Sequence, residues 1–558
     1  MIGMYIGLLL ALGVCVLLIA ITHKAQKGMN YSSYQSMVKY GIETQLFQDK
    51  HDLHRFGIAQ LLARRWGRMS AFGMSCNVMA LIGSASLLFG PAIHTGGLSI
   101  AGYGLPIIGL FSLCVSVCLA ELSSAIPTSG HIYHAAGKLG GRKWGVRAGW
   151  FHAVGHLALL ALYIGGCAYI ADTIASAMIG YKSSAISFWG FIIIIVSTQA
   201  AMNHWGTMVL GWISKCAVWV QLFIAVSILA GLVWFFWPGG YSPVLLYHFQ
   251  NFNFDGNVQI NSYILGCLLL LKLFIGMDGA SLGAEETIEP RIRVPWAIFL
   301  STAYTFVIGY VLLLFMGLVT GLTGGSEQAI SYARSIMGLD GIELFVQTAM
   351  AGWGGSSIIA LMIVISLWVS GQHSMFVCSR ALFSLARDES MPFSNRLAKV
   401  CVRRQQPIHG GWFSGLLSIC IIIVVLVIRD GGLILPLLSI AIITLHISYA
   451  IPIGLRLKER WDAKYISKYG ANVSEHLWTD APWRLGTWSM PIHGIAFLWL
   501  IGSAILTAIF VDLIGVISVA ILLLAMTTMD MGYSRERKLT SHKSLAHVPN
   551  KRTDKKAH

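Results

Sequence analysis

The stretch Gly276-Met277-Asp278-Gly279-Ala280-Ser281 lies inside a predominantly apolar run that extends from Tyr263 to Ala284. Such a run is close to the roughly 20 residues that an α-helix needs to cross the hydrocarbon core of a membrane. Glycine in a helix interior costs up to about 1 kcal/mol relative to alanine, and here two glycines flank an aspartate. Together these residues predict a membrane-spanning helix that is broken near its middle.

A second apolar run, Ala71–Ile93, carries a similar interruption, which reads Ile82-Gly83-Ser84-Ala85-Ser86. Unwound backbone is tolerated in a bilayer only where protein buries it or where it lines an aqueous cavity. Its free N–H groups can hold a carboxylate, and its free carbonyls can hold an ammonium or a cation. Two breaks five spans apart are typical of an inverted repeat with a binding site at the midplane. The alternative is that Gly83 and Gly276 only allow close helix packing.

The composition indicates that the membrane is the solvent for most of the chain. Of its 558 residues, 56% are hydrophobic and 11% are charged, whereas about a quarter of a soluble globular chain is charged. The net charge of +15 does not indicate a nucleic-acid partner, because the basic residues cluster in short segments between apolar runs. That distribution is typical of a multi-pass protein with its positive loops inside.

Twelve core spans and one extra N-terminal span, Ile2–Ile21, are predicted. No basic residue precedes the extra span, and Lys24 and Lys27 follow it, so we expect a retained helix with the N-terminus outside. If the spans alternate in direction from there, most of the 39 lysines and arginines lie on the cytoplasmic side, as does the C-terminus. The expected location is the plasma or inner membrane of a cell. The expected divisions are 1–23 (extra helix), 24–69 (cytoplasmic segment along the membrane surface), 70–530 (transporter domain, with repeats 70–237 and 260–456 and two further helices) and 531–558 (basic cytoplasmic tail).

Asp278 and Lys272 are the ionisable residues placed deepest in the predicted spans. A charge at a helix centre costs about 2.5 to 3.5 kcal/mol on insertion scales, so a partner or a function is expected for each. Asp278 faces the ammonium of a solute or caps the second half-helix through backbone N–H groups. Lys272 contacts an acidic group of the solute or extends outward to the membrane surface.

His152 and His156 are four residues apart and share one face of the third core span. One interpretation is a metal pair or a proton relay. The sequence offers no third ligand nearby, which favours hydrogen-bonded core histidines and predicts no metal site. No nucleophile, base and metal ligands assemble into a catalytic site, so we expect no enzyme activity and no cofactor beyond a coupling ion, H⁺ or Na⁺.

Several longer motifs follow one another in a characteristic order. They are Leu119-Ala120-Glu121-Leu122-Ser123-Ser124-Ala125-Ile126-Pro127-Thr128-Ser129-Gly130, Phe274-Ile275-Gly276-Met277-Asp278-Gly279-Ala280, Ser379-Arg380-Ala381-Leu382-Phe383, Ile447-Ser448-Tyr449-Ala450-Ile451-Pro452-Ile453 and Pro482-Trp483-Arg484-Leu485-Gly486. With them the chain resembles the amino acid–polyamine–organocation (APC) superfamily, and most closely its amino-acid/choline permeases, which include GABA permeases. The resemblance implies an all-α, five-plus-five inverted-repeat (LeuT-like) fold, alternating access, and a solute held between the two breaks.

The predicted function is therefore a secondary active transporter of an amino acid or a related amine-bearing solute. The alternative is a solute sensor built on a transporter scaffold. The sequence contains no phosphate-binding loop of the kind that would indicate transport driven by ATP. Expected partners are the solute and membrane lipid, with no nucleic acid and with the oligomeric state left open. The expected substrate-binding residues are Ile82, Gly83, Ser84, Ala85, Ser86, Phe274, Gly276, Met277, Asp278 and Gly279, with Lys272 as a selectivity residue.

Overall fold

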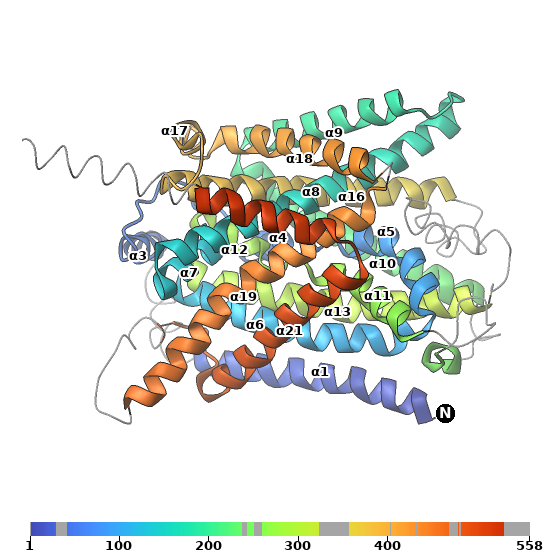
Figure 1. Ribbon diagram of the computed structural model, residues 1–558, viewed down its shortest axis with the longest axis horizontal. Coiled ribbons are helices and arrows are strands. Elements are labelled where there is room, and N and C mark those ends of the chain that lie inside the picture. Colours follow the sequence, from blue (N-terminus) through green and yellow to red (C-terminus); the bar gives the residue numbers. More distant parts are fainter. Residues whose placement is uncertain are drawn as a thin grey trace, which may run out of the picture.

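The protein is described by a computed structural model in which helices run lengthwise between the two ends of one bundle (Figure 1). The structure describes residues 2–29, 42–236, 243–249, 259–322, 356–401, 403–429, 432–467, 478 and 481–528. Within these residues the regular structure is helical, apart from two isolated β-bridges. The predicted all-α class is confirmed, and the predicted tail 531–558 lies outside the described residues.

The helices follow the predicted spans, with most of them longer by a turn or more. They are α1 (Ile2–Met29), α3 (Ile42–His54), α4 (Arg68–Met79), α5 (Leu81–Gly96), η1 (Ile100–Gly104), α6 (Leu105–Ala125), α7 (His131–Gly140), α8 (Arg142–Ile179), α9 (Ala185–Trp205), α10 (Thr207–Phe236), η2 (Pro243–Tyr247), α11 (Ile260–Leu271), η3 (Lys272–Phe274), α12 (Gly279–Leu282), η4 (Ala284–Glu286), α13 (Pro290–Leu322), α16 (Ser356–Arg387), α17 (Ser394–Leu397), α18 (Ile408–Ile428), α19 (Ile434–Ser467), η5 (Gly486–Trp488) and α21 (Ser489–Phe510).

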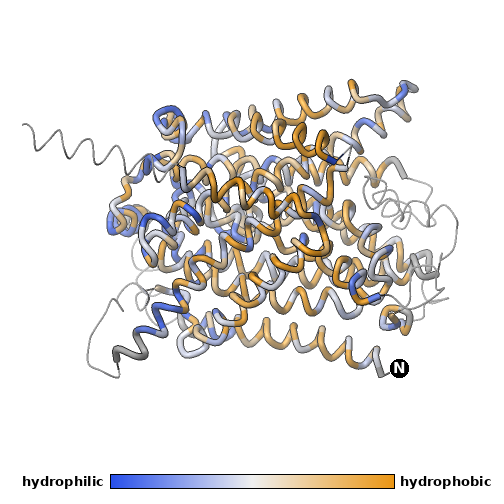
Figure 2. Tube along the Cα trace, viewed as in Figure 1, coloured by the Kyte–Doolittle hydropathy of each residue, from blue (hydrophilic) through white to orange (hydrophobic). Residues whose placement is uncertain are grey.

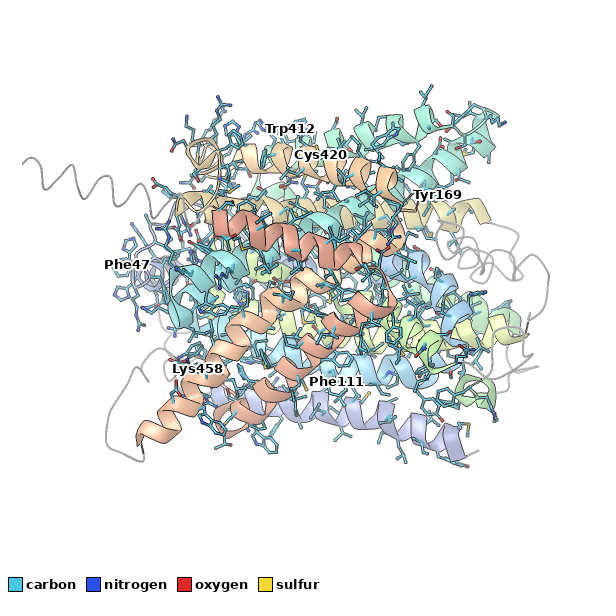
Figure 3. All side chains as sticks on the ribbon, viewed as in Figure 1. Phe47, Phe111, Tyr169, Trp412, Cys420 and Lys458 are labelled. Carbon is cyan, nitrogen blue, oxygen red and sulfur yellow. The ribbon has the colours of Figure 1, made fainter. Side chains whose placement is uncertain are left out.

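Twelve spans among the described residues are long and apolar enough to cross a membrane, and a shorter apolar helix, Ile514–Thr528, follows them. Figure 2 shows hydrophobic residues along the middle of the bundle and hydrophilic residues gathered toward its two ends. Large apolar side chains face outward from the peripheral helices, as Trp412 does on α18 with 49% of its surface exposed (Figure 3). An apolar outer belt between polar ends is what a hydrocarbon solvent requires.

The two halves of the bundle pack against each other through equivalent helices. α5 contacts α11, α6 contacts α13, α8 contacts α16, and α9 contacts α18. In each of these pairs the two helices hold the same position in the first and the second repeat. The interrupted helices α4/α5 and α11/α12 are the first members of the two repeats, which places the two breaks opposite each other at the centre.

Helix α1 is the extra N-terminal helix and lies at the edge of the bundle against α6 (Figure 1). It continues to Met29, beyond the expected end at residue 23. Leu9 and Ile19 on this helix are 67% and 70% exposed, so one face of α1 is left for lipid.

The segment that precedes α4 packs into one end of the bundle, which we call the α3 end. Figure 1 shows α3, α7 and α17 at this end, and Figure 3 places Phe47 and Lys458 there, with Tyr169 toward the opposite end. The segment was expected to lie along the membrane surface, but Leu53, Leu62 and Trp66 are buried. The Trp66 indole donates a hydrogen bond to the Thr207 carbonyl at 2.7 Å, so the segment is held by the protein rather than by lipid headgroups.

Buried ionisable groups fasten this segment to the turn after α12. The Arg64 guanidinium donates to the carbonyls of Ala284 (3.1 Å) and Thr287 (2.6 Å) and lies 3.9 Å from the Asp49 carboxylate. Asp49 also accepts the backbone N–H of Glu289 at 2.9 Å. Burial raises the pKa of Asp49 from 3.8 to about 6, although Arg64 opposes the shift.

Docking of this segment is expected to weaken as the pH rises. Asp49 has a higher pKa in the docked segment than in the undocked one, so docking is favoured when Asp49 is protonated. This contribution of Asp49 to the stability of docking is full below about pH 4 and is lost as the pH rises through about 6. Amide hydrogen exchange of residues 49–66, corrected for intrinsic rates, should show more protection at pH 5 than at pH 7. Asp49→Asn should flatten this dependence and increase protection at pH 7. Asp462→Asn, at an exposed acid on α19, is the control; identical pH profiles for Asp49→Asn and the wild type would contradict the assignment.

Candidate functional site

The first break lies at Ala80, two residues before the predicted stretch. Helix α4 ends at Met79, Ala80 adopts a left-handed conformation (φ 55°, ψ 61°), and α5 begins at Leu81. Residues 82–86 therefore form the first turns of α5, and the expectation that they unwind was wrong. Gly83 serves close packing instead, because a Cβ there would approach the Leu367 side chain to 2.7 Å.

The second break lies where it was predicted, at residues 275–278. Helix α11 and the short turn η3 end at Phe274, and α12 begins at Gly279. Gly276 has φ 91°, a conformation that residues with a Cβ rarely adopt, and a Cβ there would meet Val78 Cγ1 at 2.5 Å. The two breaks are thus in contact, Gly276 against the last turn of α4.

Side chains from other elements bind the backbone groups that the breaks leave free. The Tyr163 hydroxyl donates to the Val78 carbonyl at 2.6 Å, and the Ser84 hydroxyl donates to the Met79 carbonyl at 2.8 Å. In the second half, Ser75 accepts the N–H of Ala280 at 2.9 Å. This satisfaction of polar backbone is what permits uncoiled chain inside a membrane.

Asp278 is fully buried and binds side chains from two other helices. Its Oδ2 lies 2.5 Å from Nε2 of His152, its Oδ1 lies 3.5 Å from Nε2 of His156, and Oδ1 also accepts the hydroxyl of Tyr449. The carboxylate makes no capping hydrogen bond to α12, so that alternative was wrong. The fold turns Asp278 toward α8 and α19 instead.

Lys272 is fully buried and does not extend to the membrane surface, which corrects the second alternative for this residue. Its ammonium donates to Tyr163 Oη (2.6 Å), Ser84 Oγ (3.0 Å) and the Met79 carbonyl (3.3 Å). All three acceptors are neutral, and no carboxylate among the described residues pairs with this ammonium. A buried charge without a counter-charge is costly, which makes Lys272 a candidate to bind an anion.

Toward the α3 end, two adjacent buried glutamates form ion pairs with arginines of α16. Glu285 binds Arg387 (3.1 Å) and the Ser129 hydroxyl (2.7 Å), and Glu286 lies 2.6 Å from Arg380. Burial disfavours the charged form of Glu285, but Arg387 and Ser129 outweigh burial and lower its pKa. Burial raises the pKa of Glu286 to about 7 against the opposing effect of Arg380.

The structure therefore places Asp278 and Lys272 at the two breaks. It also places four residues there that the sequence did not assign to the site, namely His152, His156, Tyr163 and Tyr449. The sequence favoured core histidines for His152 and His156 because their third partner, Asp278, is 126 residues after His152 and is not apparent from local sequence. Tyr163 and Tyr449 were missed, although a tyrosine hydroxyl inside an apolar span is itself a signal of a polar partner. Binding of solute by residues 82–86, Phe274, Gly276, Met277 and Gly279 stays a prediction.

Residues 67–529 match a family model described as amino acid permease. This chain belongs to the amino acid permease family. The resemblance to the APC superfamily is thereby confirmed, and the permease is a membrane transporter rather than an enzyme.

The alignments with curated relatives cover most of the permease. It is 27% identical to the amino-acid permease BAT1 of Arabidopsis thaliana over 81% of this chain and 87% of that protein. It is 25% identical to the BAT1 homolog of Oryza sativa (82% and 86%) and 23% identical to amino-acid permease 2 of Neurospora crassa (80% and 79%). The residues that match the family model, 67–529, include both breaks.

Gly276→Ala is expected to destabilise the permease by about 2 to 4 kcal/mol, because the substitution combines a strained φ with a contact to Val78. Thermal unfolding of the detergent-purified protein measures the loss. Gly494→Ala is the matched control, since no atom lies within 4 Å of a Cβ at that helical position. Equal melting temperatures for the two variants would show that the close contact at Gly276 does not exist.

Proposed function

We propose that the protein carries an amino acid across the membrane by alternating access, with the solute bound between the breaks at Ala80 and at residues 275–278. The observation that carries the proposal is a buried ammonium, Lys272, beside the first break and a buried carboxylate, Asp278, at the second. The names of the curated relatives, all amino-acid permeases, support the same class of solute.

The charges at the breaks suit the two ends of an amino acid. The N-terminal end of α5 carries partial positive charge, and the protonated Lys272 side chain adds to it, since its three hydrogen-bond acceptors are neutral. A solute carboxylate supplies the counter-ion. The carbonyl groups and the carboxylate at residues 275–278 form the complementary negative region for the solute ammonium.

Alternating access requires that the α3 end open and close. The ion pairs Glu285–Arg387 and Glu286–Arg380, and the docked segment around Arg64, hold the elements of that end together, and we propose that they keep it closed. We propose that the α3 end faces the cytoplasm of a cell membrane with the N-terminus of α1 outside, as the basic segments indicate. Opening toward the cytoplasm then breaks these contacts while the opposite end closes.

Proteoliposome uptake tests the function. The full-length protein should accumulate labelled amino acid against its gradient when an H⁺ or Na⁺ gradient is imposed, and uptake should stop when that gradient is dissipated. The effective gradient identifies the coupling ion. Protein-free liposomes are the control. Saturable binding without flux under either gradient would favour a sensor and overturn the proposal.

Lys272→Met tests the contact with a carboxylate and keeps most of the side-chain volume. The loss of a buried counter-charge should raise the KM for the amino acid at least about 10-fold, or about 1.4 kcal/mol. Solutes that carry a second acidic group should be affected most if Lys272 selects for such groups. Lys182→Met, at an exposed lysine of the opposite end, is the control. An unchanged KM for every solute would remove Lys272 from the site.

A further inference from the structure

A convergent set of buried side chains links α8 to the second break. His152 and His156 lie four residues apart on α8, and both direct Nε2 toward Asp278. The two Nε2 atoms are 3.2 Å apart, and they lie 2.5 Å and 3.5 Å from the two carboxylate oxygens. In the described part of the chain, no other three His, Cys, Asp or Glu side chains bring ligand atoms together in this way.

Hydrogen bonds cannot satisfy the three contacts among His152, His156 and Asp278 all at once. If His152 donates its Nε2 proton to Asp278, that nitrogen has no lone pair left for His156. If both imidazoles carry the proton on Nε2, each N–H can point to one carboxylate oxygen, but the two Nε2 atoms then lie 3.2 Å apart with no acceptor between them. If His156 is unprotonated at Nε2, its lone pair faces the carboxylate oxygen at 3.5 Å. A cation at the centre removes each of these conflicts, because all three atoms then donate lone pairs to it.

We infer that His152, His156 and Asp278 form a binding site for a divalent transition-metal ion, of which Zn²⁺ fits best. In a tetrahedral zinc site with bonds of about 2.0 Å, neighbouring ligand atoms are about 3.3 Å apart. The Nε2–Nε2 separation of 3.2 Å and the His156 Nε2–Oδ1 separation of 3.5 Å are close to this value. His152 lies 2.5 Å from the other oxygen, Oδ2, so the carboxylate has to turn until one oxygen faces both imidazoles. Two imidazoles and one carboxylate form a common ligand set for Zn²⁺.

The donor set also discriminates among ions. Mg²⁺ and Ca²⁺ prefer oxygen ligands, whereas imidazole nitrogen suits zinc and the other first-row transition metals. Tyr449 donates its hydroxyl to Asp278 and orients the carboxylate, which is the usual task of a group beside a metal ligand. Three protein ligands leave a fourth position for water or for a donor atom of the solute.

Binding of the metal would join two parts of the molecule that have to move relative to each other. His152 and His156 belong to the long helix α8, and Asp278 belongs to the break before α12. This consequence rests on the proposed function: a bound ion ties the break to α8 and arrests alternating access. Micromolar Zn²⁺ should therefore inhibit uptake reversibly, and a chelator should restore it.

Metal binding itself is measured on the purified full-length protein in detergent. Zn²⁺ titrated by calorimetry should bind at one high-affinity site, and Zn²⁺ should raise the melting temperature of the folded protein. Co²⁺ should give the visible absorption bands of a tetrahedral site with nitrogen and oxygen ligands. His156→Gln and Asp278→Asn should each weaken Zn²⁺ binding at least about 10-fold.

His446→Gln is the matched control, because His446 is also buried in the membrane region but binds Ser503 rather than a carboxylate. This variant should bind Zn²⁺ as the wild type does, which separates the site from adventitious binding at other histidines. Melting curves without metal establish that each variant is folded. The proposal is overturned if the wild type shows no saturable Zn²⁺ site, or if folded His156→Gln binds Zn²⁺ as tightly as the wild type.

The two proposals fail separately. Calorimetry, Co²⁺ spectra and Zn²⁺-dependent melting need no transport, so a protein that carries no amino acid still reveals the site. A protein that transports amino acids but has no saturable zinc site retains the proposed function and loses this inference. Inhibition of the wild type and of His446→Gln by Zn²⁺, with His156→Gln resistant, would support both.

Discussion

The need to satisfy uncoiled backbone inside a membrane governs the centre of this molecule. Lipid offers no hydrogen-bond partner, so the groups freed at Ala80 and at residues 275–278 have to be bound by protein. Tyr163, Ser84 and Ser75 do this from neighbouring helices. The same requirement draws polar side chains into an otherwise apolar bundle, and those side chains in turn determine where charged residues are tolerated.

The buried charges follow from that polar centre. Lys272 binds the acceptors that surround the first break, and Asp278 is held by the donors of α8 and α19 beside the second. The partners of Lys272 are neutral, and those of Asp278 are two histidines and a tyrosine. Arginine–carboxylate pairs lie elsewhere, on Glu285 and Glu286 at the α3 end. The buried charges therefore form two groups, one at the breaks and one at the α3 end.

The docked segment before α4 connects the N-terminal part of the chain with the α3 end. Arg64 binds the carbonyls of Ala284 and Thr287, and the backbone N–H groups of Arg65 and Trp66 donate to the Glu286 carbonyl. These contacts lie one turn beyond α12, which itself begins at the second break. The second break and the docked segment are thus connected by a short, hydrogen-bonded path.

Hydrophobic run lengths, glycine pairs and the distribution of basic residues were enough to predict the helical class, the spans and the second break, because these properties depend on the chain's transfer between water and lipid. They also predicted that Asp278 and Lys272 are central. The position of the first break, the burial of Lys272 and the partner of His152 and His156 were decided only by tertiary structure. Left-handed backbone at Ala80, where no glycine signals it, and contacts between residues 126 positions apart arise from packing between the two repeats, which local sequence does not encode.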